Sequence, residues 1–345
     1  MEKLKTGYAY HGNRMLNHAE SDLRDMAAHH GNVVVHMLSH TDWERHKTTI
    51  KEMVDITHGL GMEAWIDNWG LGGAPGDKSH FLAYYPDSHV IFSDGSMDPA
   101  QVCLNSPDYR KFTKEWIDVV EWTGAKKIFW DEPYLPDKKV DDKTYFGCAC
   151  PRCKKLFREQ YGYDMPLFEN EDVANFRVDS IADFFRDVTE YSASRGIENA
   201  ACVMIGSSGM SLQKSEKLFT LPHLDDIGSD PYWIGRSNDP YTYVYNSATF
   251  NLGLANRYGK KHNLWVQTFN NPVGEEEDIV AATEALYDAG ARTILAWGYY
   301  GSISNDYRAK NPLVAKVKTE EAFRRIWDKE RDRIFAEARA KILNK

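Results

Sequence analysis

Residues 107–133 read PDYRKFTKEWIDVVEWTGAKKIFWDEP. Residues 107–123 have the pattern of an amphipathic helix. Gly124 follows as a stop signal, because glycine readily adopts the left-handed conformation found just past helix ends. Residues 127–130 then read as a short buried strand. A strand and a helix together make one β/α unit, and the same arrangement recurs along the chain.

Eight strand-like runs alternate with helical segments from end to end. The predicted strands are residues 7–10, 32–37, 63–67, 127–130, 200–205, 226–229, 264–268 and 293–297. The clearest helical segments are residues 43–58, 107–123, 181–195 and 275–289, each with a glycine near its end. Eight β/α units without a glycine-rich phosphate-binding motif favour a (β/α)8 TIM barrel over a doubly wound sheet.

The sequence has no internal repeat and no low-complexity linker, so one domain accounts for residues 1–345. Three connections that follow strands are longer than barrel closure requires, and in a barrel such loops build the active-site face. We expect residues 319–345 to form a C-terminal helix that caps the barrel. Its apolar stripe comprises Phe323, Ile326, Trp327, Ile334, Phe335 and Ala338.

Composition narrows the class of partner. A net charge of −9 argues against nucleic acid and anionic membranes, which both need clustered Lys and Arg. Aromatic residues make up 13% of the chain, which suits platforms for sugar rings, and we expect a carbohydrate substrate. No stretch approaches 18 apolar residues and no apolar leader is apparent, so we expect a cytoplasmic protein. A homo-oligomer is compatible with the sequence, which does not set the oligomeric state.

The cysteines form a metal-binding pattern. Cys148, Cys150 and Cys153 stand together as C-A-C-P-R-C, and Cys103 precedes them in an earlier loop. Four thiolates at this spacing predict a tetrahedral structural Zn²⁺ site with no coordination position open to substrate. The alternative is a group of unrelated thiols. The fifth cysteine, Cys202, lies in an apolar run and reads as a buried small hydrophobe.

Two adjacent carboxylates end the fourth strand, in the stretch Trp130-Asp131-Glu132-Pro133. Strand alternation sends Trp130 and Glu132 to one side and Asp131 to the other. A glutamate desolvated by aromatic rings has a raised pKa and can act as a general acid. We expect Glu132 to be catalytic and Asp131 to orient it or a substrate hydroxyl, with a structural ion pair as the alternative.

Other strand ends supply further polar and aromatic groups to the same face of the barrel. For the second catalytic carboxylate Asp230 is the first choice and Asp67 the next, although either aspartate could instead cap a turn. The residues that we expect to bind substrate are His36, Asn68, Trp69, Trp130, Trp233, Gln267, Trp297 and Tyr299. A carboxylate pair between aromatic walls is what glycosidic cleavage needs.

The strand-four motif resembles the Asn-Glu-Pro acid/base motif of the large clan of retaining glycosidases built on TIM barrels. The cysteine pattern resembles the zinc site of glycoside hydrolase family 42, the β-galactosidases, and FREQYG at 157–162 is also typical of such enzymes. The resemblance covers residues 5–320. It implies Glu132 as acid/base and the four cysteines as zinc ligands. Along its length the chain also resembles uncharacterised barrel proteins described as glycosidases.

Two positions depart from that clan. Asp131 stands in place of its Asn, and Gln267 stands near the position of its nucleophilic Glu on strand seven. The second carboxylate could come from Asp230 or Asp67, an acetamido group of the substrate could attack with Asp131 steering it, or Gln267 could be an engineered change. Two other functions stay open: a carbohydrate-binding barrel without catalysis, and a metal-dependent sugar isomerase or lyase that uses His36 and Asp67.

Overall fold

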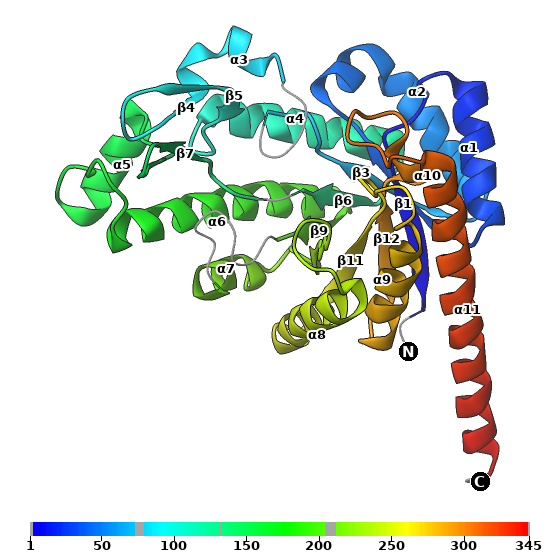
Figure 1. Ribbon diagram of the computed structural model, residues 1–345. Helices are drawn as coiled ribbons and strands as arrows, with labels where there is room; N and C mark the ends of the chain where they lie inside the picture. Colours follow the sequence, from blue (N-terminus) through cyan, green and yellow to red (C-terminus); the bar gives the residue numbers. More distant parts are fainter. Residues whose placement is uncertain (1–2, 73–78, 132, 204–211, 344–345) are drawn as a thin grey trace. The chain divides into compact units, whose positions relative to one another are not determined.

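The computed structural model describes residues 3–72, 79–131, 133–203 and 212–343. Eight parallel strands close into a barrel in the hydrogen-bonded order β1-β12-β11-β10-β9-β6-β3-β2 (Figure 1). The TIM-barrel prediction is therefore confirmed. The barrel strands are β1 (Lys5–Tyr10), β2 (Val33–Met37), β3 (Glu63–Asp67), β6 (Lys127–Trp130), β9 (Glu198–Cys202), β10 (Asp226–Ser229), β11 (Lys261–Gln267) and β12 (Thr293–Trp297).

Helices alternate with these strands, and two hairpins lie in the long loops after β3 and β6. The helices are α1 (Leu16–Ala28), α2 (His40–Gly59), α3 (Phe81–Tyr84), α4 (Pro107–Thr123), α5 (Pro151–Tyr161), α6 (Glu171–Ser194), α7 (Leu212–Phe219), α8 (Pro240–Arg257), α9 (Glu277–Asp288), α10 (Tyr299–Ser302) and α11 (Pro312–Leu343). The hairpins pair β4 (His89–Ile91) with β5 (Met97–Val102) and β7 (Asp137–Val140) with β8 (Lys143–Phe146).

The chain divides into two compact units. The first unit comprises residues 1–36, 52–65 and 228–345, and the second comprises residues 37–51 and 66–227. In the first unit β1 pairs with β2 at Gly7, where an added Cβ would lie 2.0 Å from the carbonyl oxygen of Val33. Only glycine fits this close approach of two backbones. Tyr8 packs on the helix side of β1 against Phe323 of α11 and Tyr299.

In the second unit the two sides of β6 have different roles. Trp130 packs against Trp116 of α4 and Phe185 of α6, and its indole N–H donates to Asn199 Oδ1 (2.9 Å). It therefore points toward the helices. Because side chains alternate along a strand, Lys127 and Phe129 point to the barrel side. Lys127, at the start of β6, forms a buried ion pair with Asp226.

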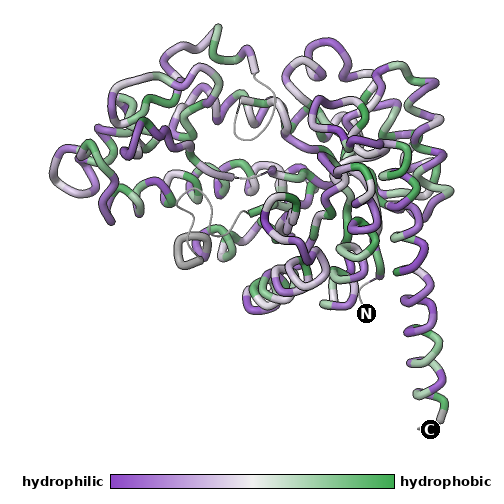
Figure 2. Tube along the Cα trace, viewed as in Figure 1, coloured by the Kyte–Doolittle hydropathy of each residue, from purple (hydrophilic) through white to green (hydrophobic). Residues whose placement is uncertain are grey.

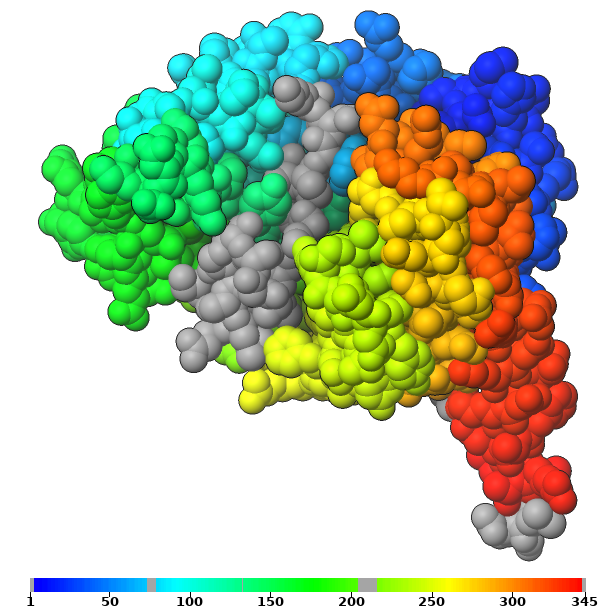
Figure 3. Space-filling model, viewed as in Figure 1, coloured from blue at the N-terminus to red at the C-terminus, as the bar shows by residue number. Residues whose placement is uncertain are grey.

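The C-terminal helix differs from the prediction. It begins at Pro312, and Phe323 and Ile326 are buried, whereas Ile334 and Phe335 are 48% and 66% exposed. A 32-residue helix is about 48 Å long, and a six-residue strand such as β1 spans only about 20 Å. The last turns of α11 therefore extend past the strands of the first unit (Figures 1 and 3), with hydrophobic and hydrophilic residues mixed along them (Figure 2).

Among the described residues, every helix is too short or too polar to span a membrane.

Candidate functional site

The four cysteines of the predicted metal site come together in the second unit. Cys103 follows β5, Cys148 and Cys150 follow β8, and Cys153 lies in the first turn of α5. All four are buried, and their sulfurs lie within 4.8 Å of one another. All are free thiols. They pack in an apolar cluster with Val90, Phe146, Phe157, Val173 and Phe176.

The geometry of this cluster fits zinc. Tetrahedral Zn–S bonds of about 2.3 Å put neighbouring sulfurs roughly 3.8 Å apart. Sγ of Cys103 lies 3.8 Å from Sγ of Cys150 and 3.5 Å from Sγ of Cys153. Two N–H groups donate to these sulfurs, from the Asn105 side chain to Cys153 (3.4 Å) and from the Cys153 backbone to Cys150 (3.5 Å). Such donors stabilise thiolates, the form that binds metal.

The end of β3 holds a fully buried carboxyl group. Asp67 is 0% exposed, and its Oδ1 accepts the backbone N–H of Trp69 (2.8 Å). Its Oδ2 is buried and has no hydrogen-bond partner among the residues that the structure describes. Burial raises the pKa of Asp67 well above its ordinary range. The group is therefore suited to hold a proton near neutral pH rather than to attack as an anion.

Asp131, directly after β6, contacts the residue that follows Asp67. Its backbone N–H donates to the side-chain Oδ1 of Asn68 (3.0 Å). The backbone N–H of Asn68 in turn donates to the Phe129 carbonyl (3.4 Å). Asp131 is 7% exposed. The second unit thus brings together Asp67, Asn68 and Asp131 of the predicted site, with half-buried Trp69 next in the chain. Trp130, predicted to bind substrate, instead points toward α4 and α6. Glu132 lies outside the described residues.

In the first unit Gln267 ends β11 and holds the loop that follows β10. Its Oε1 accepts the backbone N–H of Ile234 (3.2 Å), and its Nε2 donates to the carbonyl of Phe269 (3.4 Å). A glutamate at this position could accept from Ile234 but would set a carboxylate oxygen against the Phe269 carbonyl. The local structure therefore uses both the oxygen and the nitrogen of the Gln267 side-chain amide. This accounts for a glutamine at this position without an engineered change.

The other predicted residues of the first unit have different surroundings. Trp297 faces the same side as Trp265, with ring centroids 5.2 Å apart, and is 6% exposed. Trp233 is 2% exposed, and Asp230 is half-buried directly after β10. The hydroxyl of Tyr299 donates to Asp25 of α1 (2.7 Å). Tyr299 therefore lies on the helix side of the strands.

His36 also lies on the helix side. Its Nε2 shares a hydrogen bond with Thr57 Oγ1 of α2 (2.9 Å), and the ring is 0% exposed. Burial lowers the pKa of His36 to about 3. The imidazole therefore packs neutral against α2, away from the groups on the barrel side of its strand.

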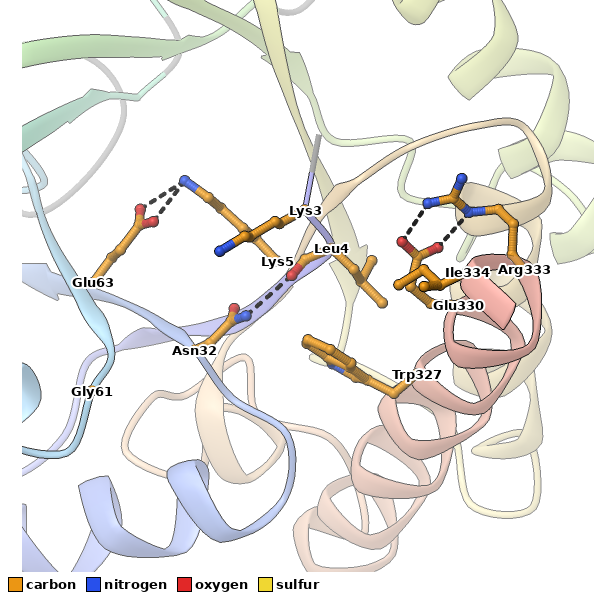
Figure 4. A pocket seen from close by; sticks show the side chains of 10 residues that line it. All are labelled: Lys3, Leu4, Lys5, Asn32, Gly61, Glu63, Trp327, Glu330, Arg333 and Ile334. Atoms are coloured by element: carbon orange, nitrogen blue, oxygen red, sulfur yellow. Dashed lines mark hydrogen bonds and ion pairs between the residues drawn. The ribbon is translucent and has the colours of Figure 1, made fainter. Parts of the chain in front are cut away.

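Described residues of the first unit line two cavities of interest. One, of about 340 Å³, lies at the ends of β1 and β12. There Tyr10 donates to Asp22 (2.6 Å), a contact that the pattern of strands and helices in the sequence does not signal. The other, of about 480 Å³, lies at the start of β1 beside Trp327 and Arg333 of α11 (Figure 4). Active sites of TIM barrels form where the strands end, so the second cavity is not a candidate catalytic site.

Neither a family model nor a curated protein matches the sequence. Among solved structures, the chain is similar to the catalytic domain of β-amylase from Paenibacillus polymyxa, with 9% identity, a TM-score of 0.62 and coverage of 86% of this chain and 92% of that one. It is also similar to an endo-β-1,4-mannanase from Thermotoga petrophila, with 12% identity, a TM-score of 0.57 and coverage of 94% of this chain and 77% of that one. A D-allulose 3-epimerase from Methylomonas sp. is similar as well, with 12% identity, a TM-score of 0.54 and coverage of 94% of this chain and 99% of that one. At these identities the comparisons show a shared barrel fold.

Proposed function

We propose that this protein is a glycoside hydrolase that acts on a short oligosaccharide or glycoside. The observation that supports the proposal is the group of acidic and amide residues at the ends of β3 and β6, where the Asp131 backbone N–H donates to Asn68, the residue after Asp67. Glycosidic cleavage needs one carboxyl group to protonate the leaving oxygen and a second to attack or to activate water. The solved structures with this fold include two enzymes named for the hydrolysis of polysaccharides.

In this proposal Glu132 is the general acid and Asp230 the second carboxylate. Asp67 is the weaker candidate for the second role, because its buried carboxyl group holds its proton and a nucleophile or general base must be ionised. A protonated Asp67 would instead donate a hydrogen bond to a substrate oxygen. Gln267 is engaged with Ile234 and Phe269 and would position the loop beside the substrate.

The resemblance to glycoside hydrolase family 42 is part of the same proposal. Cys103, Cys148, Cys150 and Cys153 would hold one Zn²⁺, which would join the loop after β5 to the loop after β8. A metal with four sulfur ligands has no free position, so it supplies rigidity to the loops and no chemistry. The catalytic steps then depend on the carboxyl groups alone.

Product analysis distinguishes this proposal from its rivals. The protein would be incubated with reducing and non-reducing disaccharides, aryl glycosides and free ketoses, and the products separated by chromatography. A hydrolase releases a new monosaccharide, whereas an epimerase converts one free ketose into another. We expect release of monosaccharide that is lost in Asp230→Asn and retained in part in Asp67→Asn. Epimerised ketose, or sugar binding without any product, would replace the proposal with the isomerase or the binding protein.

A further inference from the structure

A second group of metal-binding side chains lies in the second unit and involves none of the four cysteines. His40 and Glu44 are one helical turn apart at the start of α2, and His80 directly precedes α3. Nε2 of His40 lies 3.4 Å from Oε1 of Glu44, and Nε2 of His80 lies 2.9 Å from the same oxygen. The three ligand atoms lie within 4.8 Å of one another.

We propose that His40, Glu44 and His80 bind a divalent transition-metal ion such as Zn²⁺ or Ni²⁺. Bonds of about 2.0–2.2 Å at tetrahedral angles put neighbouring ligand atoms roughly 3.3–3.6 Å apart. The distance from Glu44 to His40 (3.4 Å) lies in that range, whereas the distance to His80 (2.9 Å) is that of a hydrogen bond. Because the two rings are stacked, His80 must rotate on binding so that the ion comes to lie in the planes of both imidazoles. Imidazole and carboxylate are ligands that Zn²⁺ and Ni²⁺ accept. This site is independent of the proposed hydrolysis.

The surroundings of His40 hold it in place as a ligand. Its Nδ1 shares a hydrogen bond with Ser79 Oγ (2.8 Å), which leaves Nε2 as the nitrogen turned to Glu44. The ring packs edge-on against Phe112 (4.7 Å between centroids) and is stacked on His80 (3.9 Å, 11° between planes). Metal-bound histidines commonly have their second nitrogen fixed in this way.

An ordinary ion pair explains less of this arrangement. A hydrogen bond or ion pair between His80 and Glu44 accounts for the 2.9 Å contact but not for the approach of His40 Nε2 to the same oxygen at 3.4 Å. A metal ion uses both imidazoles and the carboxylate at once. The side chains of His80 and Glu44 are 37% and 42% exposed, so an ion can enter from solvent. Three protein ligands would leave a position for water or another oxygen ligand.

The site would join two segments that follow neighbouring strands. His40 comes after β2, its backbone N–H donates to the Gly70 carbonyl after β3 (3.1 Å), and His80 lies further along that second loop. A bound ion would therefore fix the loop after β3 to the start of α2.

The first unit provides a matched control. Asp25, His29 and Glu320 also lie within 4.8 Å of one another. There, however, Lys316 pairs with Asp25 (2.9 Å) and also with Glu320, so a side-chain cation already serves both carboxylates. We expect no metal ion to bind at this second cluster.

Calorimetric titration of Ni²⁺ into protein whose zinc content has first been measured tests the site. We expect one Ni²⁺ per chain in wild type and in His29→Ala. Loss of an outer-shell partner alone typically weakens metal binding roughly 10–100-fold, so His80→Ala and Glu44→Gln should each weaken it by at least about 100-fold. Both changes are at partly exposed side chains, and circular dichroism checks that each variant is folded.

Equal Ni²⁺ binding in wild type and His80→Ala would overturn the site, as would the absence of any binding to wild type. A thiolate-to-nickel charge-transfer band on titration would place the ion on the cysteines and would equally contradict it. Loss of binding in His29→Ala would move the ion to the control cluster.

Discussion

At the scale of single residues, Asp67 is the side chain whose chemistry differs most from its ordinary behaviour. Burial raises its pKa, so above about pH 4 the unfolded chain releases this proton while the folded protein keeps it. The folded state therefore loses stability relative to the unfolded state as the pH rises, by up to about 1.4 kcal/mol per pH unit until the folded pKa is reached.

This difference predicts the behaviour of Asp67→Asn. Asparagine does not titrate, and its oxygen can still accept the Trp69 N–H. The stability of Asp67→Asn relative to wild type should rise as the pH is raised above about 4, and should level off once the folded carboxyl group ionises, as measured by urea unfolding at each pH. A stability difference that is independent of pH would show that Asp67 is ionised in the folded protein.

At the scale of secondary-structure elements, the four cysteines connect the β4–β5 and β7–β8 hairpins to α5. Because zinc binding is coupled to folding of the loops that carry its ligands, loss of one thiolate should release the metal and lower the melting temperature. We expect Cys103→Ser to fall well below one zinc per chain. Cys202→Ser is the control, since Cys202 is buried in β9 outside the cluster and its loss should leave zinc bound. Equal zinc content in both variants would exclude the cysteine site.

Individual elements also show what sequence reasoning can predict. Strands β3, β6, β10 and β12 match their predicted bounds to the residue, because short apolar runs with polar ends mark them. Helix α6 begins at Glu171, ten residues before its prediction, since Asn170 caps it by accepting the Val173 N–H, a contact that no periodicity reveals. Helix α1 has no side-chain cap at its start, and although the alternation of strands and helices predicts a helix here, no capping residue marks its first residue.

The sequence predicts which types of residue lie at the strand ends, but not which side of the barrel wall each side chain faces. Strand alternation gave the separation of Trp130 from Asp131, but it cannot say which side faces the barrel; packing against Trp116 and Phe185 decides that. His36 and Tyr299 were placed in the site because they follow or end strands. The partner of His36 is Thr57 of the next helix, and the partner of Tyr299 is Asp25, 274 residues earlier; packing of helices on the strands brings each pair together.

At the scale of the whole molecule, α11 combines a buried half with an exposed half. Each fully buried apolar side chain contributes about 1.5–3 kcal/mol, and Phe323 and Ile326 are both 0% exposed. Deletion of residues 336–345 should therefore shift the melting temperature by only a degree or two, whereas deletion of residues 321–345 should prevent folding. Loss of folding in the shorter deletion would mean that the exposed turns are covered in solution.

The function of the whole molecule depends on turnover, and one measurement tests it most directly. The rate of hydrolysis of a panel of aryl glycosides would be compared between wild type and Glu132→Gln, with zinc content measured in both. General acid catalysis contributes roughly 10²–10⁴-fold, so kcat/KM should fall by that factor in the variant while zinc stays at one per chain. Turnover that is equal in the two proteins, or absent from wild type on every glycoside, would contradict the glycosidase.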